Sequence, residues 1–160
     1  MPVIILESHS QEQTRKIGRF LGGRILSGTV ITLNGELGAG KTVLAKGVGE
    51  GLGIKKAITS PSFVLMNIYH GRFNFYHFDF YRLEEEEELG ELGLEEYFYD
   101  EGVVLVEWAD KFIDSLPATR LDICIEKSKD NLENGRILYF IPQGKFDLTV
   151  LEELESQCFC

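Results

Sequence analysis

Apolar residues recur along the chain at spacings that predict alternating strands and helices. Three short runs of apolar and β-branched residues predict strands: residues 3–6, 29–33 and 103–107. Apolar positions at helical spacing predict helices over residues 11–26 and 41–52, and Ser10 with Gln13 forms a candidate capping box before the first helix. An α/β fold follows from this alternation.

The second half of the chain adds strands that do not fit a purely parallel sheet. Runs at residues 63–69 and 73–78 are separated only by His70-Gly71-Arg72, a connection that suits an antiparallel hairpin. Two further strands and a closing helix are predicted over residues 120–126, 136–141 and 148–154. The glutamate run at residues 84–88, continuing to Leu94, predicts a solvated helix or helical turn, with a partner-binding face as the alternative.

Length and charge narrow the function classes. A chain of 160 residues is expected to form one domain with a real core, residues 156–160 being a frayed tail. The net charge of −10 disfavours nucleic-acid binding by the chain alone, unless a local basic groove or a partner overrides it. Cys124, Cys158 and Cys160 do not form a disulfide framework, and no apolar run could span a bilayer. We therefore expect a soluble, cytoplasmic protein with reduced thiols and no membrane association.

A phosphate-binding motif lies between the second predicted strand and the helix at 41–52. Residues 35–42 read Gly-Glu-Leu-Gly-Ala-Gly-Lys-Thr and match G-x-x-x-x-G-K-[ST]. Glycines let successive backbone N–H groups point at a phosphate, Lys41 reaches the β- and γ-phosphates, and the Thr42 hydroxyl binds Mg²⁺. The motif predicts an ATP site that uses magnesium.

Such a loop needs an acidic partner at the end of a buried strand. Asp79 and Glu107 each end a strand-like run, with a strand-end cap and a surface acid as their alternative interpretations. The hydroxyl-rich segment 59–63 suits either a γ-phosphate sensor or an ordinary turn. Trp108 suits a core position or a mobile aromatic at the nucleotide or partner surface, and His77 suits a hydrogen-bonded strand histidine or a base.

Together these motifs resemble the TsaE (YjeE) family, small bacterial ATPases required for making threonylcarbamoyl-adenosine in tRNA. The matching segments are residues 35–42, 60–63, 77–82, 91–94 and 106–108. The resemblance spans about Ser10 to Arg136 and implies a P-loop NTPase-like, three-layer α/β fold with a mixed, partly antiparallel central sheet. It also implies that the protein hydrolyses ATP slowly and acts in a complex with the TsaB and TsaD partners during modification of tRNA position 37. The partners would hold the tRNA, so this chain would contact it only indirectly.

The resemblance also implies roles for single residues. Lys41, Asp79 and Glu107 become the catalytic residues, and Thr42 and Glu107 become the magnesium contacts. The expected nucleotide contacts are Gln11, Glu36, Leu37, Gly38, Ala39, Gly40, Lys41, Thr42, Val43, Ser62 and Arg136. Among these, Gln11 and Arg136 would lie near the base, and Ser62 would occupy the switch position. Ser62 stands where the family usually has Thr, and Glu36 where it usually has Asp, and both replacements keep the functional group.

Two other functions use the same phosphate loop. A small-molecule kinase would transfer the γ-phosphoryl group to an acceptor, and a nucleotide-gated binding module would change conformation with negligible turnover. Against the kinase, the sequence has no arginine-rich lid segment: Arg120 and Arg136 are isolated, and residues 84–101 are acidic. Measured ATP turnover and its products would separate the three functions.

Overall fold

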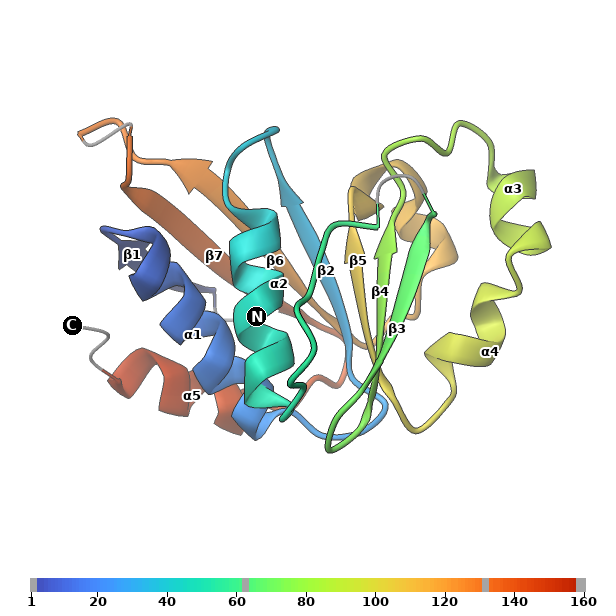
Figure 1. The fold of residues 1–160 in the computed structure, drawn as a ribbon, viewed down its shortest axis with the longest axis horizontal. Coiled ribbons are helices and arrows are strands. Elements are labelled where there is room, and N and C mark those ends of the chain that lie inside the picture. The colour runs from blue at the N-terminus through green and yellow to red at the C-terminus, as the bar shows by residue number, and fades with distance from the viewer. Residues whose placement is uncertain (1–2, 62–63, 131–132, 158–160) are drawn as a thin grey trace.

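The computed structural model describes residues 3–61, 64–130 and 133–157 (Figure 1). The strands are β1 (Ile4–Ser8), β2 (Val30–Gly35), β3 (Met66–His70), β4 (Asn74–Asp79), β5 (Val103–Glu107), β6 (Arg120–Lys127) and β7 (Arg136–Gln143). The helices are α1 (Gln11–Arg24), α2 (Lys41–Gly51), α3 (Glu86–Glu91), α4 (Leu94–Phe98) and α5 (Leu148–Ser156), with a 3₁₀ helix, η1 (Ala109–Ser115).

The strands form one mixed sheet in the order β1-β7-β6-β2-β5-β4-β3. Its centre is parallel, because β2 pairs with both β5 and β6 and β5 pairs with β4 in that sense. Its two sides are antiparallel, through the β3–β4 hairpin and through β7, which pairs with β6 and β1. The predicted mixed, partly antiparallel sheet is confirmed.

Helices cover both faces of the sheet, which makes the fold three-layered (Figure 1). Helices α1, α2 and α5 pack on one face with Ile31 and Leu33 of β2. Helices α3, α4 and η1 pack on the other face with Val104 and Val106 of β5. Strand β5 is buried along its whole length, as its continuous apolar sequence predicts.

Helices α1 and α2 pack closely because glycines lie where their backbones touch. A Cβ added at Gly22 would lie 2.2 Å from the carbonyl oxygen of Val48, and one at Gly47 would lie 2.2 Å from that of Arg15. Both distances are far below a van der Waals contact, so only glycine allows the two helix backbones to approach this closely. The contact fixes the start of α1 beside the start of α2.

Several boundaries differ from the predicted ones. Helix α1 ends at Arg24 because the Ile25 backbone turns to an extended conformation. Strand β3 starts at Met66 because the N–H groups of Val64 and Leu65 turn back to the Pro61 carbonyl, with Leu65 at φ +69°. The rest of the predicted start of that strand lies outside the described residues.

The acidic segment and the C-terminus show similar corrections. The predicted acidic helix is two short helices, α3 and α4, separated at Gly93, whose φ is +65°. Ser156 still belongs to α5, so the helix includes the first residue of the predicted tail, and Cys158 and Cys160 lie outside the described residues. Cys124 is a free, half-buried thiol. In the described ranges, none of the helices has both the length and the apolar character needed to cross a membrane.

Candidate functional site

The phosphate loop connects β2 to α2 as the motif predicts. Gly38 and Gly40 take positive φ values of +80° and +110°, a backbone region that favours glycine, and Gly40 is the N-cap of α2. Gly35 lies so close to β6 that a Cβ there would approach the Ile125 carbonyl oxygen to 2.6 Å. The loop thus wraps tightly over the N-terminus of α2, where free N–H groups and the helix dipole favour an anion.

Lys41 is the buried cation of the loop. Its Nζ donates hydrogen bonds to the carbonyl oxygens of Gly35 (2.7 Å) and Glu36 (2.9 Å) and lies 4.3 Å from the ring centroid of Trp108. Burial lowers the pKa of Lys41, while the nearby carboxylates of Glu107 and Asp79 act in the opposite direction. The ammonium group therefore sits at the junction of the loop with the strand-end acids.

Asp79 and Glu107 are brought side by side by strand register. They are paired residues at the ends of the parallel strands β4 and β5, and each is only 3% exposed. Glu107 is therefore not a surface acid. Asp79 Oδ1 accepts the N–H of Tyr81 at 2.9 Å, so Asp79 caps the strand end and also faces the loop.

His77 is hydrogen-bonded to Glu107. His77 Nε2 and Glu107 Oε2 lie 2.6 Å apart in a buried hydrogen bond, and His77 has no exposed surface. The other ring nitrogen, Nδ1, is buried without a hydrogen-bond partner among the described residues. This geometry fits the strand-histidine interpretation and makes His77 a positioning residue for the carboxylate.

A cavity of about 300 Å³ joins the loop and the acids. It is lined by Gln11, Thr14, Leu37, Gly38, Gly40, Lys41, Thr42, Val43, Ser60, Asp79, Glu107, Trp108, Asn134 and Arg136. Glu36 and Ala39 instead border a neighbouring hollow, and their carbonyl oxygens accept hydrogen bonds from Lys41 and Arg136. The predicted contact Ser62 lies outside the described residues.

Arg136 reaches the loop from the first residue of β7. Its Nε donates to the Ala39 carbonyl at 2.7 Å, and its Nη2 donates to the Gly38 carbonyl at 3.4 Å. Gln11 and Thr14, in the first turn of α1, line the same cavity. Thr14 and Asn134 were missed by the sequence motifs, although Thr14 follows Gln11 by three residues and so shares its helix face.

Trp108 has both a core contact and a place in the cavity. It lines the cavity, and it also packs against the core that α3, α4 and η1 cover. Its backbone is left-handed at φ +58°, its N–H donates to the Leu33 carbonyl at 3.2 Å, and its ring lies 4.9 Å from that of Tyr81. A non-glycine residue held in this backbone region is uncommon and costs about 1–3 kcal/mol. In this backbone conformation the indole ring lies over the ammonium group of Lys41.

The donor atoms around the cavity suit magnesium. Thr42, Asp79 and Glu107 offer a hydroxyl and two carboxylates, the oxygen ligands that Mg²⁺ prefers. Within the described residues, no group of three or more His, Cys, Asp or Glu side chains could hold a metal by itself. Mg²⁺ is usually bound by one or two carboxylates together with phosphate oxygens. The site therefore fits an ion that is shared with a triphosphate.

Comparisons with known proteins identify related sequences and a related structure. The family model for "Threonylcarbamoyl adenosine biosynthesis protein TsaE" matches residues 8–137. The tRNA threonylcarbamoyladenosine biosynthesis protein TsaE of Bacillus subtilis is 45% identical over 121 residues, 75% of each chain. The protein of the same name from Treponema pallidum is 39% identical over 123 residues, 77% of this chain and 91% of that one. The crystal structure of Bacillus subtilis YdiB superposes with a TM-score of 0.82 at 35% identity, covering 96% of this chain and 94% of that chain.

Proposed function

Because this chain belongs to the TsaE family of threonylcarbamoyl adenosine biosynthesis proteins, we propose that it binds ATP with magnesium and hydrolyses it slowly during modification of tRNA position 37. One observation carries the proposal: the phosphate loop, with Lys41, opens into the same cavity as the paired strand-end acids Asp79 and Glu107. A glycine-rich turn that served only the fold would not need two buried carboxylates beside its lysine.

Different groups of the chain have different roles in the proposed hydrolysis. The backbone N–H groups of the loop and the N-terminus of α2 bind the phosphates, and Lys41 neutralises charge on the β- and γ-phosphates. Thr42 and Glu107 would hold the magnesium ion, which neutralises further phosphate charge when bound. Asp79 is the remaining carboxylate in the cavity and orients the attacking water. Because these groups are buried, their electrostatic effect is larger than it would be in water.

The subunit is proposed to act with TsaB and TsaD. Hydrolysis can drive a complex only if the ATP and ADP states bind its partners with different affinities. The cavity wall includes Ser60 of the hydroxyl-rich segment that continues to Ser62. If this segment contacts the γ-phosphate, its conformation would differ between the ATP and ADP states. That difference would change the surface to which a partner binds.

Two measurements test the proposal. Calorimetry should show Mg-ATP binding by the wild-type chain and little or none by a folded Lys41→Ala variant, because that change removes the fixed cation beside the phosphates. Turnover should be slow for the chain alone and should change when TsaB, TsaD and tRNA are added. Asp79→Ala should lower turnover more than ATP affinity. Unchanged ATP affinity in Lys41→Ala would refute the site, and phosphoryl transfer to a metabolite would favour the kinase.

A further inference from the structure

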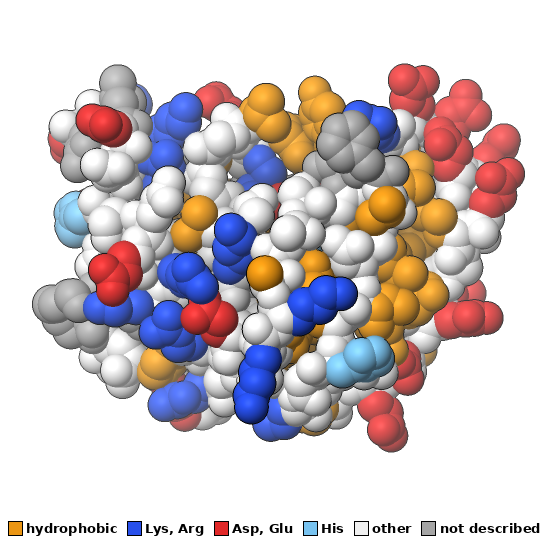
Figure 2. All heavy atoms as spheres, in the orientation of Figure 1, with side chains coloured by type: hydrophobic (Ala, Val, Ile, Leu, Met, Phe, Trp, Pro, Cys, Tyr) orange, Lys and Arg blue, Asp and Glu red, His pale blue; other side chains and the backbone are white. Residues whose placement is uncertain are grey.

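The chain's negative charge is unevenly distributed. Figure 2 shows Lys and Arg side chains gathered over α1 and α2, and Asp and Glu side chains gathered at the end of the molecule that carries α3 and α4. A hollow of about 380 Å³ lies in the basic region, where α1 and α2 meet the segment after α2. It is lined by Arg15, Lys46, Glu50, Ile54, Lys55, Lys56, Ala57 and Ile58. Four of its eight lining side chains are cations, in a chain whose net charge is −10.

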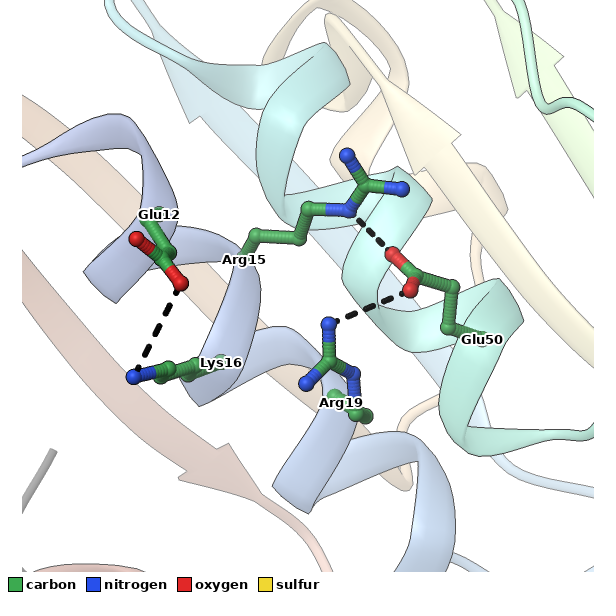
Figure 3. A network of polar contacts seen from close by, with 5 residues as sticks. All are labelled: Glu12, Arg15, Lys16, Arg19 and Glu50. Atoms are coloured by element: carbon green, nitrogen blue, oxygen red, sulfur yellow. Dashed lines mark hydrogen bonds and ion pairs between the residues drawn. The ribbon is translucent and has the colours of Figure 1, made fainter.

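Among the described residues that line the hollow, Glu50 is the only acid, and its charge is already neutralised. Arg15 and Arg19 of α1 both donate hydrogen bonds to its carboxylate, each to a different oxygen (Figure 3). Lys46, Lys55 and Lys56 have no such carboxylate within the lining of the hollow, and Lys55 and Lys56 are exposed. The hollow therefore presents an excess of positive charge to its occupant.

We propose that this basic hollow binds the phosphate backbone of RNA, so that the chain contacts tRNA directly. An excess of cations in a concave site attracts negative charge, so a polyanion is the expected occupant. Relatives of this chain are named for tRNA modification, so a polyanionic RNA is the macromolecule on which the family's pathway acts. The inference goes beyond the proposed ATPase function and does not require ATP turnover.

The composition of the hollow favours RNA over an acidic protein. Cores of protein–protein interfaces are enriched in aromatic residues and arginine and are depleted in lysine. The lining of this hollow has three lysines, one arginine and no aromatic side chain. Lysine contributes a mobile point charge, which suits contacts with phosphate groups that carry no sequence information.

The hollow is also placed next to the nucleotide cavity. Lys46 follows Thr42 by four residues on α2, which is about one helical turn or 6 Å. The segment after α2 lines the hollow at Ile58 and lines the nucleotide cavity at Ser60. RNA held in the hollow would therefore contact the same helix and segment that line the ATP site.

A pair of charge-matched variants tests the proposal. Lys55→Ala/Lys56→Ala removes two exposed lysines from the hollow, and Lys129→Ala/Lys145→Ala removes two exposed lysines that do not line it. Both variants have the same net charge, so an effect of net charge alone would lower their tRNA affinity equally. The probe is a fluorescently labelled, unmodified tRNA transcript with adenosine at position 37, titrated with the full chain at several salt concentrations.

The expected result is weaker tRNA binding by Lys55→Ala/Lys56→Ala, on the order of tenfold at low salt, with little change in the control pair. The slope of log affinity against log salt should fall by about 1.5, because two phosphate contacts are lost. Thermal melting and Mg-ATP affinity should stay at wild-type values in both variants, because none of these lysines lines the nucleotide cavity.

Three outcomes would overturn the inference. Wild-type chain that does not bind the transcript, or equal losses in both variants, would show that the hollow does not bind RNA. Loss of affinity for a TsaB–TsaD complex in Lys55→Ala/Lys56→Ala, with tRNA binding unchanged, would assign the hollow to an acidic protein surface instead. Failure of wild-type chain to bind ATP would count against the proposed function and leave this inference standing.

Discussion

Two adjacent glycines of α1 should respond in opposite ways to the same substitution. A Cβ at Gly22 would lie 2.2 Å from the carbonyl oxygen and 2.9 Å from the carbonyl carbon of Val48, both in the backbone of α2. A Cβ at Gly23 would have only the Gly51 carbonyl oxygen nearby, at 3.9 Å, which is an ordinary contact. The two positions therefore separate the effect of helix propensity from the effect of packing.

The size of each effect follows from these contacts. Replacing glycine by alanine inside a helix stabilises it by about 1 kcal/mol when nothing clashes. At Gly22 the clashing atoms are backbone, so no side chain can rotate away and the two helices must separate by about 1 Å. Overpacking of this kind costs about 1–3 kcal/mol and outweighs the propensity gain. Gly22→Ala should destabilise the protein by up to about 2 kcal/mol, and Gly23→Ala should stabilise it by up to about 1 kcal/mol.

Urea denaturation of the three proteins measures these differences, and calorimetry with Mg-ATP measures their effect on the site. Separation of the helices would move Gln11 and Thr14 of α1 away from Thr42 at the start of α2, so Gly22→Ala should also weaken ATP binding. Gly23→Ala should leave ATP affinity unchanged. If Gly22→Ala were as stable as Gly23→Ala, the close helix contact would not constrain the fold and the reasoning would be wrong.

Three further predictions concern the cavity. His77→Leu removes a buried hydrogen bond from Glu107 and should cost about 1–3 kcal/mol in urea denaturation while raising the magnesium concentration needed for half-maximal turnover. His77→Gln, which keeps a donor, should recover part of both losses. Chelation of magnesium should weaken ATP binding in calorimetry, and Glu107→Gln should reduce that weakening because one repelling charge is gone. Because burial lowers the pKa of Lys41, ATP affinity measured from about pH 7 to 10 should fall as the ammonium group loses its proton below the ordinary pKa of 10.5. Whatever affinity Lys41→Arg retains should not fall in this way, because the guanidinium group stays protonated.

The parts of the site that were predictable from the sequence are those fixed by local patterns. The phosphate loop is a contiguous motif, so its residues identified both the turn and the helix that follows. Asp79 and Glu107 each end an apolar run, and in a parallel pair of strands such ends lie at one edge of the sheet. The hairpin of β3 and β4 followed from its short connection.

Other features depend on contacts between segments that are distant in sequence. The left-handed backbone of Trp108 and the 3₁₀ helix η1 after it have no local glycine or cap signal, because they are set by packing against β2 and Tyr81. Asn134 reaches the cavity from the turn before β7, far from the loop in sequence. The basic hollow was also missed, because net charge is one number for the whole chain and says nothing about where the charges lie.

The arrangement of charge in the cavity separates the role of the loop lysine from the role proposed for magnesium. Lys41 faces two buried carboxylates, Asp79 and Glu107, and Arg136 also lines the cavity, so the charged side chains of the lining are two cations and two carboxylates before any ligand binds. A triphosphate adds further negative charge to the same space and would be repelled without a cation of its own. Under the proposed function, the two carboxylates would make magnesium a condition of nucleotide binding, while Lys41 and the N-terminus of α2 would act on the phosphates directly.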